Sequence, residues 1–173
     1  MISDFVDEYH RYRVLGEKAM AQVSDDALNL RITDDGNSIA MIVRHVGGNL
    51  ASRFTDFLTD DGEKPWRVRD EEFETRAYAR AEVQEWWARG WDVLERTLGA
   101  LGDGDLGRAV RIRGQSLTVH AALCRSLSHV AYHVGQIVLL ARGSSGEAWQ
   151  SLSIPKGQSA EYNRNPTREK RPT

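Results

Sequence analysis

The sequence contains little cysteine, little proline and no long apolar segment. Cys124 is the single cysteine among 173 residues, which excludes an internal disulfide and any metal site built from several thiolates. No window approaches the roughly 18 consecutive apolar residues of a membrane-spanning helix, and the first residues, MISD, lack the basic and apolar regions of a secretory signal. We therefore expect a cytoplasmic protein with no membrane partner, in which histidines and carboxylates bind any metal.

A large net charge of one sign is also absent. Lysine and arginine number 23 against 25 aspartates and glutamates, and the formal net charge is −2. This balance argues against nucleic acid as a partner. Because the length suits a single core, we expect residues 1–162 to form one domain and the polar residues 163–173 to form a disordered tail.

Apolar residues recur at steps of three and four in four segments, which predicts four long amphipathic helices. The expected helices span residues 2–23, 38–59, 80–101 and 119–142. Gly143 is expected to end the last of them. Residues 109–113 and 116–119 alternate apolar with polar side chains around Gly114 and Gln115, which predicts a small hairpin. The expected fold class is all-α, a four-helix bundle with a small β-hairpin before the last helix.

Two histidines of the last predicted helix, His129 and His133, are four residues apart and therefore lie on one helix face, about one turn apart. Such a pair alone is more often an ordinary surface or core feature than a metal site. Both histidines flank the apolar stripe, however, at a position that can face the interior of a bundle, where facing helices build metal sites. His45, on a flank of the second predicted helix, would supply a third ligand. His10 and His120 have no partner at ligand spacing.

Three neutral imidazoles suit one divalent transition metal, zinc or nickel above all, and leave a coordination position open. The metal would act as a Lewis acid, lower the pKa of a bound water, or hold a thiolate as a nucleophile. The residues alone do not distinguish among these three roles.

Several polar residues of the second predicted helix and of the connection after it are candidates for the lining of a pocket. They are Asn49, Arg53, Asp56, Lys64 and Arg67. The helical ones continue the flank of His45, although a solvated helix edge is the alternative interpretation. The connection at 59–67, TDDGEKPWR, has no periodicity, and long loops are often functional. Arg53 would bind a substrate carboxylate, and Asp56 would orient a ligand histidine or accept a proton.

Cysteine and tryptophan have simpler interpretations. Cys124 lies about 160° around the last predicted helix from the histidine flank, so we expect it to point away from the metal and to pack as a small apolar residue. Trp86, Trp87 and Trp91 follow a helical period, which is typical of core and interface side chains.

The segments that contain the three histidines, IAMIVRH and SHVAYHVGQ, resemble the DinB/YfiT-like superfamily of four-helix-bundle metalloenzymes. TDDGEKPWR and the later segment SIPKG are similar to a bacterial subfamily of unknown function. The resemblance implies a three-histidine site at His45, His129 and His133, nickel or zinc as the metal, and a homodimer. For some relatives it also implies transfer of a low-molecular-weight thiol such as bacillithiol or mycothiol, while the substrate of this subfamily is not implied.

The first functional hypothesis is a divalent-metal-dependent enzyme, either a thiol S-transferase or a hydrolase, acting on a small molecule. The alternative is a non-catalytic protein that binds metal or a small molecule in a stress response. A fourth protein ligand would favour the alternative, because closed metal sites are structural. In a third interpretation the histidines are structural and the tryptophan-rich face binds another protein.

Overall fold

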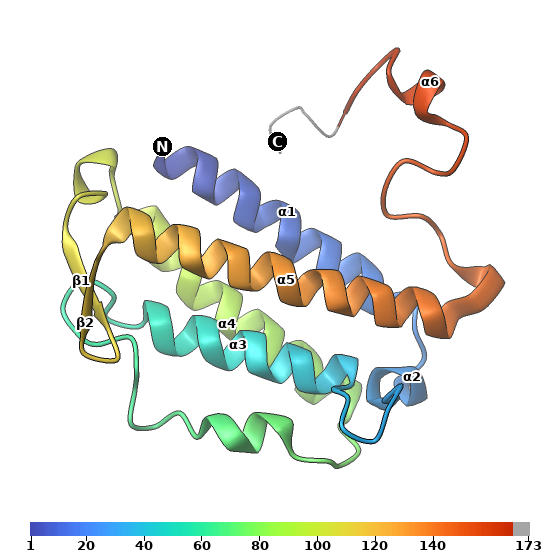
Figure 1. Cartoon of the computed structure of the whole chain (residues 1–173), viewed down its shortest axis with the longest axis horizontal. Helices are drawn as coiled ribbons and strands as arrows, with labels where there is room; N and C mark the ends of the chain where they lie inside the picture. Colours follow the sequence, from blue (N-terminus) through green and yellow to red (C-terminus); the bar gives the residue numbers. More distant parts are fainter. Residues whose placement is uncertain (168–173) are drawn as a thin grey trace.

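Four long helices form the body of the protein, as a computed structural model that describes residues 1–167 shows. They are α1 (Ile2–Met20), α3 (Ile39–Phe54), α4 (Arg80–Ala100) and α5 (Val119–Ser145). The helices run along a common direction (Figure 1), with α3 packed mainly against α4 and α1 mainly against α5. α3 also contacts α5. The prediction of a mostly helical chain is confirmed.

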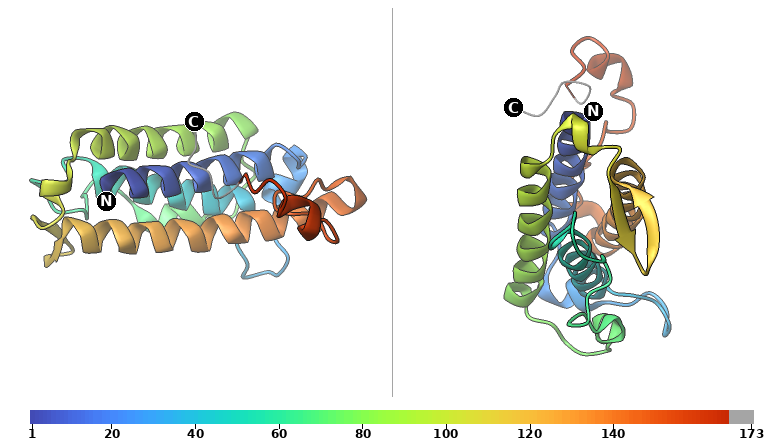
Figure 2. Two further views of the ribbon diagram at one scale, coloured as in Figure 1. Left: turned by 90° about the horizontal axis from the view of Figure 1, so that it is seen from above. Right: turned by 90° about the vertical axis from the view of Figure 1, so that its left-hand side faces the viewer.

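Short helical segments lie between the long helices and after the last of them. They are α2 (Asp25–Asn29), α6 (Ser159–Tyr162) and three 3-10 helices, η1 (Arg69–Phe73), η2 (Asp103–Asp105) and η3 (Gly146–Ala148). Two further views show α6 beyond the end of α5 (Figure 2). The tail expected to be disordered begins with hydrogen-bonded turns after α6, and residues 168–173 lie outside the described part. Within residues 1–167, the helices lack the combination of length and apolarity that crossing a bilayer requires.

The ends of the helices are defined by side-chain caps and by single backbone positions. Ser38 and Thr118 cap α3 and α5, each accepting a hydrogen bond from a backbone N–H three residues further on. α3 ends at Phe54, not at residue 59, and Asp56 then adopts a φ of 50° in the left-handed region. Phe57 is nevertheless buried. The spacing from Phe54 to Phe57 imitates a further helical turn, because Phe57 reaches the core from the bend after α3.

Two other predicted boundaries are also wrong. α1 ends at Met20, not at residue 23. α5 continues through Gly143 and ends at Ser145, and Gly146, with a φ of 53°, follows it. Glycine is favoured at such a position because it lacks the Cβ that disfavours positive φ.

The hairpin consists of β1 (Ala109–Ile112) and β2 (Gln115–Thr118), which pair antiparallel and confirm the predicted hairpin. Ile112 pairs with Gln115, so the turn residues are Arg113 and Gly114, with φ values of 53° and 72°. The predicted turn, Gly114 and Gln115, was therefore displaced by one residue. Two consecutive positive φ values are typical of the tight turn that matches the twist of paired strands.

Asp61 joins the connection after α3 to this hairpin. Its carboxylate accepts hydrogen bonds from the backbone N–H groups of Arg113 and Gly114, at 2.8 and 2.7 Å. The neighbouring Gly62 N–H donates to the carbonyl of Arg111 at 2.8 Å. The hairpin and the connection thus form a joined structure at one end of the long helices (Figure 1).

The tryptophans of α4 belong mainly to the core. Trp87 and Trp91 are buried, whereas Trp86 is half-buried. Trp91 makes an edge-on contact with Tyr9 of α1, whose hydroxyl donates to the carbonyl of Leu123 in α5 at 3.1 Å. The tryptophan-rich face that the third interpretation assigns to a partner protein is thus occupied by the chain's own core.

Two glycines allow α3 and α4 to approach each other closely. A Cβ placed on Gly90 would lie 2.6 Å from the Cα of Gly47, and one on Gly47 would lie 2.3 Å from the carbonyl oxygen of Trp86. These contacts involve backbone, which cannot rotate away. Although glycine is a poor helix former, Gly47 is therefore required here for helix packing.

We expect Gly90→Ala to lower the free energy of unfolding by about 1–3 kcal/mol, because the added methyl group forces the two helices apart. Gly99→Ala is the matched control in the same helix, since nothing lies within 4 Å of its Cβ position. This substitution should raise stability by up to about 1 kcal/mol through helix propensity. Urea denaturation of both variants measures the difference, and equal effects would contradict the close packing.

Candidate metal centre

Three histidines from two helices meet between α3 and α5. His45 is buried, His129 and His133 are half-buried, and one ring nitrogen from each lies within 4.8 Å of the others. The Nε2 atoms of His45 and His129 are 3.1 Å apart. The structure thus brings together the three residues that the sequence predicts as ligands. Among the described residues, the group that could hold a metal ion consists of these three histidines.

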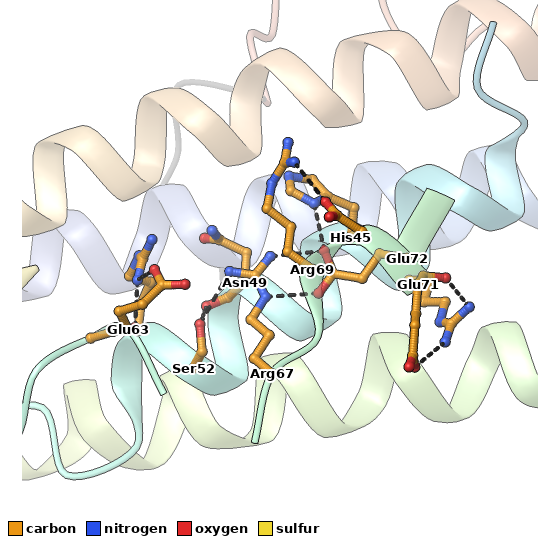
Figure 3. Close-up of polar contacts among 12 residues, drawn as sticks. His45, Asn49, Ser52, Glu63, Arg67, Arg69, Glu71 and Glu72 are labelled. Carbon is orange, nitrogen blue, oxygen red and sulfur yellow. Dashed lines mark hydrogen bonds and ion pairs between the residues drawn. The ribbon is translucent and has the colours of Figure 1, made fainter. Parts of the chain in front are cut away.

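A carboxylate that the sequence analysis missed orients His45. Glu72, in η1, is buried and lies 2.8 Å from Nδ1 of His45 (Figure 3). The same carboxylate accepts two hydrogen bonds from Arg67, from Nε at 2.7 Å and from Nη2 at 2.9 Å. Burial raises the pKa of Glu72, but the hydrogen bonds from His45 and Arg67 and the charge of Arg67 outweigh it and hold the pKa below its usual value.

The ionised state of Glu72 decides which nitrogen of His45 is available. An ionised carboxylate only accepts hydrogen bonds, so Nδ1 of His45 must carry the proton. In a neutral imidazole this leaves the lone pair on Nε2, the atom that faces His129. A carboxylate behind a ligand histidine is a common arrangement in metal sites, because it fixes the ring and makes the ligand nitrogen more basic.

His133 has a comparable partner one helical turn away. Its Nδ1 lies 2.8 Å from Oε1 of Gln136, and this amide oxygen accepts the Nδ1 hydrogen. Nε2 of His133 is therefore the unprotonated nitrogen. His129 differs, because its Nδ1 is buried and has no hydrogen-bond partner within the described residues.

The surroundings hold the half-buried histidines in the neutral form that binds metal. Burial, followed by the neighbouring His133 and His45, lowers the pKa of His129 to about 3. Burial also lowers the pKa of His133, although the hydrogen bond to Gln136 opposes the shift. Neutral imidazole is the state in which histidine ligates a metal.

Gly48 provides the space for the carboxylate. A Cβ at this position of α3 would lie 2.3 Å from Oε1 of Glu72 and 3.1 Å from its Cδ. The carboxylate cannot easily move aside, because His45 and Arg67 both hold it. The two adjacent glycines of α3 therefore have separate roles, Gly47 in helix packing and Gly48 beside the metal centre.

A cavity of about 190 Å³ adjoins the histidines. It is lined by His45, Asn49, Arg53, Phe54, Phe57, Arg67, Arg69, Ile112, Arg113, Ala122, Arg125, Ser126 and His129. Three of the five predicted pocket residues, Asn49, Arg53 and Arg67, are among them. Arg69, Arg113 and Arg125 are additions. Helix periodicity could not indicate Arg69 and Arg113, which come from the connection and the hairpin, whereas Arg125 lies four residues before His129 in α5 and was overlooked.

The other two predicted pocket residues do not line this cavity. Asp56 lies beyond the end of α3, where the helical flank of His45 no longer continues, and borders a different groove. Lys64 is buried and its Nζ is 3.3 Å from a carboxylate oxygen of Asp60. Asp56 does not contact a ligand histidine, because Glu72 occupies the orienting position on His45.

Cys124 also departs from its predicted environment. The thiol is exposed, so the interpretation as a buried packing residue is wrong. Sγ lies 3.8 Å from Nε2 of His120, a contact at helical spacing that the sequence analysis overlooked. The expectation that this cysteine is away from the metal centre agrees with the structure, since Cys124 does not line the cavity.

The fold and the site define a mostly helical protein with three histidines grouped beside an arginine-lined cavity. The chain belongs to the family described as "Protein of unknown function (DUF1572)", whose profile matches residues 1–158. Comparisons with curated proteins and with solved structures found no match.

The lowered pKa of His129 predicts a pH dependence of stability in the metal-free protein. Because the folded-state pKa lies below the ordinary value of 6.5, the unfolded chain takes up the proton first as the pH falls. The contribution of neutral His129 to the free energy of unfolding is complete above about pH 6.5 and is lost as the pH falls toward about 3. Urea denaturation at about pH 7 and about pH 5 should show lower stability at the lower pH.

Replacement of the histidine isolates this contribution. His129→Gln should reduce the difference in unfolding free energy between the two pH values, because one proton uptake is removed. His10→Gln, at an exposed histidine of α1, should leave the difference unchanged. An unaltered pH dependence in His129→Gln would contradict the lowered pKa.

Proposed function

We propose that the chain is a divalent-metal-dependent enzyme of the DinB/YfiT-like four-helix-bundle type, in which His45, His129 and His133 bind one zinc or nickel ion. The observation that carries the proposal is the convergence of three ring nitrogens, two of them oriented by partners on the opposite side of the ring, Glu72 and Gln136. Such outer partners are typical of ligand histidines.

The donor set fits this class of metal. Imidazole nitrogen suits zinc and nickel, whereas magnesium and calcium prefer oxygen. Low pKa values of His129 and His133 keep protons from competing with the ion at neutral pH. Nδ1 of His129 has no hydrogen-bond partner among the described residues, so this ring lacks the outer contact that His45 and His133 have.

An open coordination position supports an enzyme over a binding protein. Three protein ligands beside a cavity are typical of catalytic metal sites, whereas closed sites have four. Among the described residues, the group of potential ligands has three members. A fourth protein ligand, which would favour the alternative function of binding metal or a small molecule in a stress response, is not part of this group.

A bound divalent ion would supply either a thiolate or a hydroxide as the nucleophile. In S-transfer the thiol sulfur forms a bond to an electrophilic carbon, the leaving group departs with its electron pair, and the thiol proton passes to solvent. The chain's own Cys124 does not line the cavity. The thiol would therefore be a separate small molecule, of the low-molecular-weight class that the family resemblance implies.

The residues of the chain would position the reactants and exclude water. Glu72 and Gln136 orient two ligand rings, and Asn49 presents an amide to the cavity. Phe54 and Phe57 form an apolar wall beside these groups. We further propose a cytoplasmic location and, as the family resemblance implies, a homodimer.

We expect purified wild-type protein to contain about one zinc or nickel ion per chain. His45→Ala and His133→Ala should lose the ion, whereas the exposed His10→Ala should retain it. Elemental analysis measures the content, and circular dichroism checks that each variant keeps its helices. Glu72→Gln, which keeps all three ligands, should lower metal affinity by about 10–100-fold. Retention of the ion in both ligand variants would refute the site.

The metal-loaded protein should turn over one of two substrate panels. One panel combines bacillithiol or mycothiol with alkyl halides and epoxides, and the other contains esters and amides. Mass spectrometry should detect a conjugate or a hydrolysis product that falls to background in His129→Ala and persists in His10→Ala. A metal-loaded protein without turnover on either panel would favour the binding protein.

A further inference from the structure

Arginines dominate the polar lining of the cavity beside the histidines. The five are Arg53, Arg67, Arg69, Arg113 and Arg125, and no aspartate or glutamate lines the same cavity. A divalent ion at the histidines would add to this positive charge. Charged groups around a cavity of low dielectric attract a ligand of the opposite sign. How strongly these arginines attract an anion depends on how far neighbouring carboxylates neutralise them.

Three of the arginines are already paired with carboxylates behind the cavity wall. Glu63 accepts hydrogen bonds from Arg53 at 3.0 Å and from Arg113 at 2.9 Å. Glu72 is shared between Arg67 and His45. These two carboxylates fix the wall: one oxygen of Glu63 accepts from both of its arginines, and both oxygens of Glu72 are occupied. Arg53, which the sequence analysis assigned to a substrate carboxylate, is instead held by the protein itself.

The remaining two arginines lack comparable partners. Arg69 has one ion pair, of 3.8 Å to Asp70, whose side chain is fully exposed, and such pairs contribute little. Its guanidinium also lies over the Phe73 ring, 4.9 Å from the ring centroid. Arg125 makes no ion pair within residues 1–167 and is exposed. Both side chains are therefore available to a ligand without the loss of a buried ion pair.

The two arginines lie next to the metal centre on different elements, Arg69 on η1 and Arg125 on α5. Arg125 precedes His129 by four residues in α5, so the two side chains lie on one helix face. Arg69 begins η1, across from α5, and its side chain extends beside the His45 ring (Figure 3). A ligand between the two arginines would therefore also be next to the histidines.

The rest of the lining is apolar. Phe54 and Phe57 of the α3 end, Ile112 of the hairpin and Ala122 of α5 contribute to it. Inorganic phosphate would leave this surface uncovered, whereas an organic body would cover it. The cavity volume of about 190 Å³ is below the roughly 300–1,000 Å³ of sites for drug-sized ligands, which restricts the ligand to a small molecule.

We propose that the cavity binds a small organic carboxylate, with the carboxylate between Arg69 and Arg125 and the apolar body against the phenylalanines. Guanidinium groups bind carboxylates through paired, charge-assisted hydrogen bonds. The identification of this molecule as a substrate rests on the proposed function, because it depends on the adjacent metal centre. Anion binding itself depends on the arginines and not on the metal.

Calorimetric titration with sodium benzoate, and with benzamide as its uncharged analogue, tests the proposal. The titrations are carried out on protein as purified and after removal of metal with a chelator. Benzoate should bind and benzamide should bind at least about tenfold more weakly, a difference of about 1.4 kcal/mol. Persistence of benzoate binding after metal removal separates the arginine site from anion coordination by the ion.

A double variant and its matched control assign the binding to the two arginines. Arg69→Gln with Arg125→Gln should weaken benzoate binding by at least about tenfold. Arg96→Gln with Arg142→Gln removes the same charge from two exposed arginines outside the cavity, and should leave binding within about twofold. All four positions are exposed, so both double variants should remain folded.

Three results would overturn the proposal. They are equal binding of benzoate to wild type and to the Arg69 and Arg125 double variant, equal binding of benzoate and benzamide, and tighter binding of inorganic phosphate than of benzoate. Protein that is purified without metal and still binds benzoate would refute the proposed metal enzyme and leave the arginine site supported. Loss of benzoate binding in a double variant that retains its metal would support the arginine site.

Discussion

The buried carboxylate of Glu72 is the constraint on which the rest of the site depends. It lies between Nδ1 of His45 and the guanidinium of Arg67, and both partners are themselves buried or nearly so. Removal of one partner from such a group leaves an uncompensated charge inside the protein, which is far more costly than loss of a surface ion pair. The histidine tautomer, the course of the connection after α3 and the glycine at position 48 all follow from this requirement.

The same interaction links folding to ligand geometry. η1 must pack against α3 for the carboxylate to reach His45, so the ring is oriented only when the connection between α3 and α4 has folded onto α3. The second helix of the centre, α5, contributes His129 and His133 one turn apart and Gln136 behind one of them. The helices and η1 therefore hold the three imidazoles in place before a metal binds. The conformational entropy of ordering these side chains is lost during folding and not during metal binding.

The parts of the structure that depend on local periodicity were predictable. Helix faces follow from apolar spacing, and the grouping of His45 with His129 and His133 follows from their shared position at the flanks of two stripes. Glu72 was not predictable, because it acts across 27 residues from a 3-10 segment that has no periodic pattern. Asp56 was assigned to the pocket on the assumption that α3 continues, but the helix ends at Phe54 and Thr55 is extended, so Asp56 is not on the helix face. Lys64 and the pairing of Arg53 likewise depend on the path of an irregular loop, which local sequence does not determine.

The metal ligands and part of the cavity wall belong to different parts of the fold, and Asp61 fixes the second part by its hydrogen bonds to the hairpin turn. The metal ligands belong to α3 and α5, whereas part of the cavity wall belongs to the hairpin and to the connection that Asp61 attaches to it. Substitutions in β1, β2 or the turn can therefore change the shape and charge of the wall while the histidines keep their positions. Related chains can in this way diverge in the molecules they accept while they retain one metal chemistry, as happens in folds where loops on a rigid scaffold determine specificity.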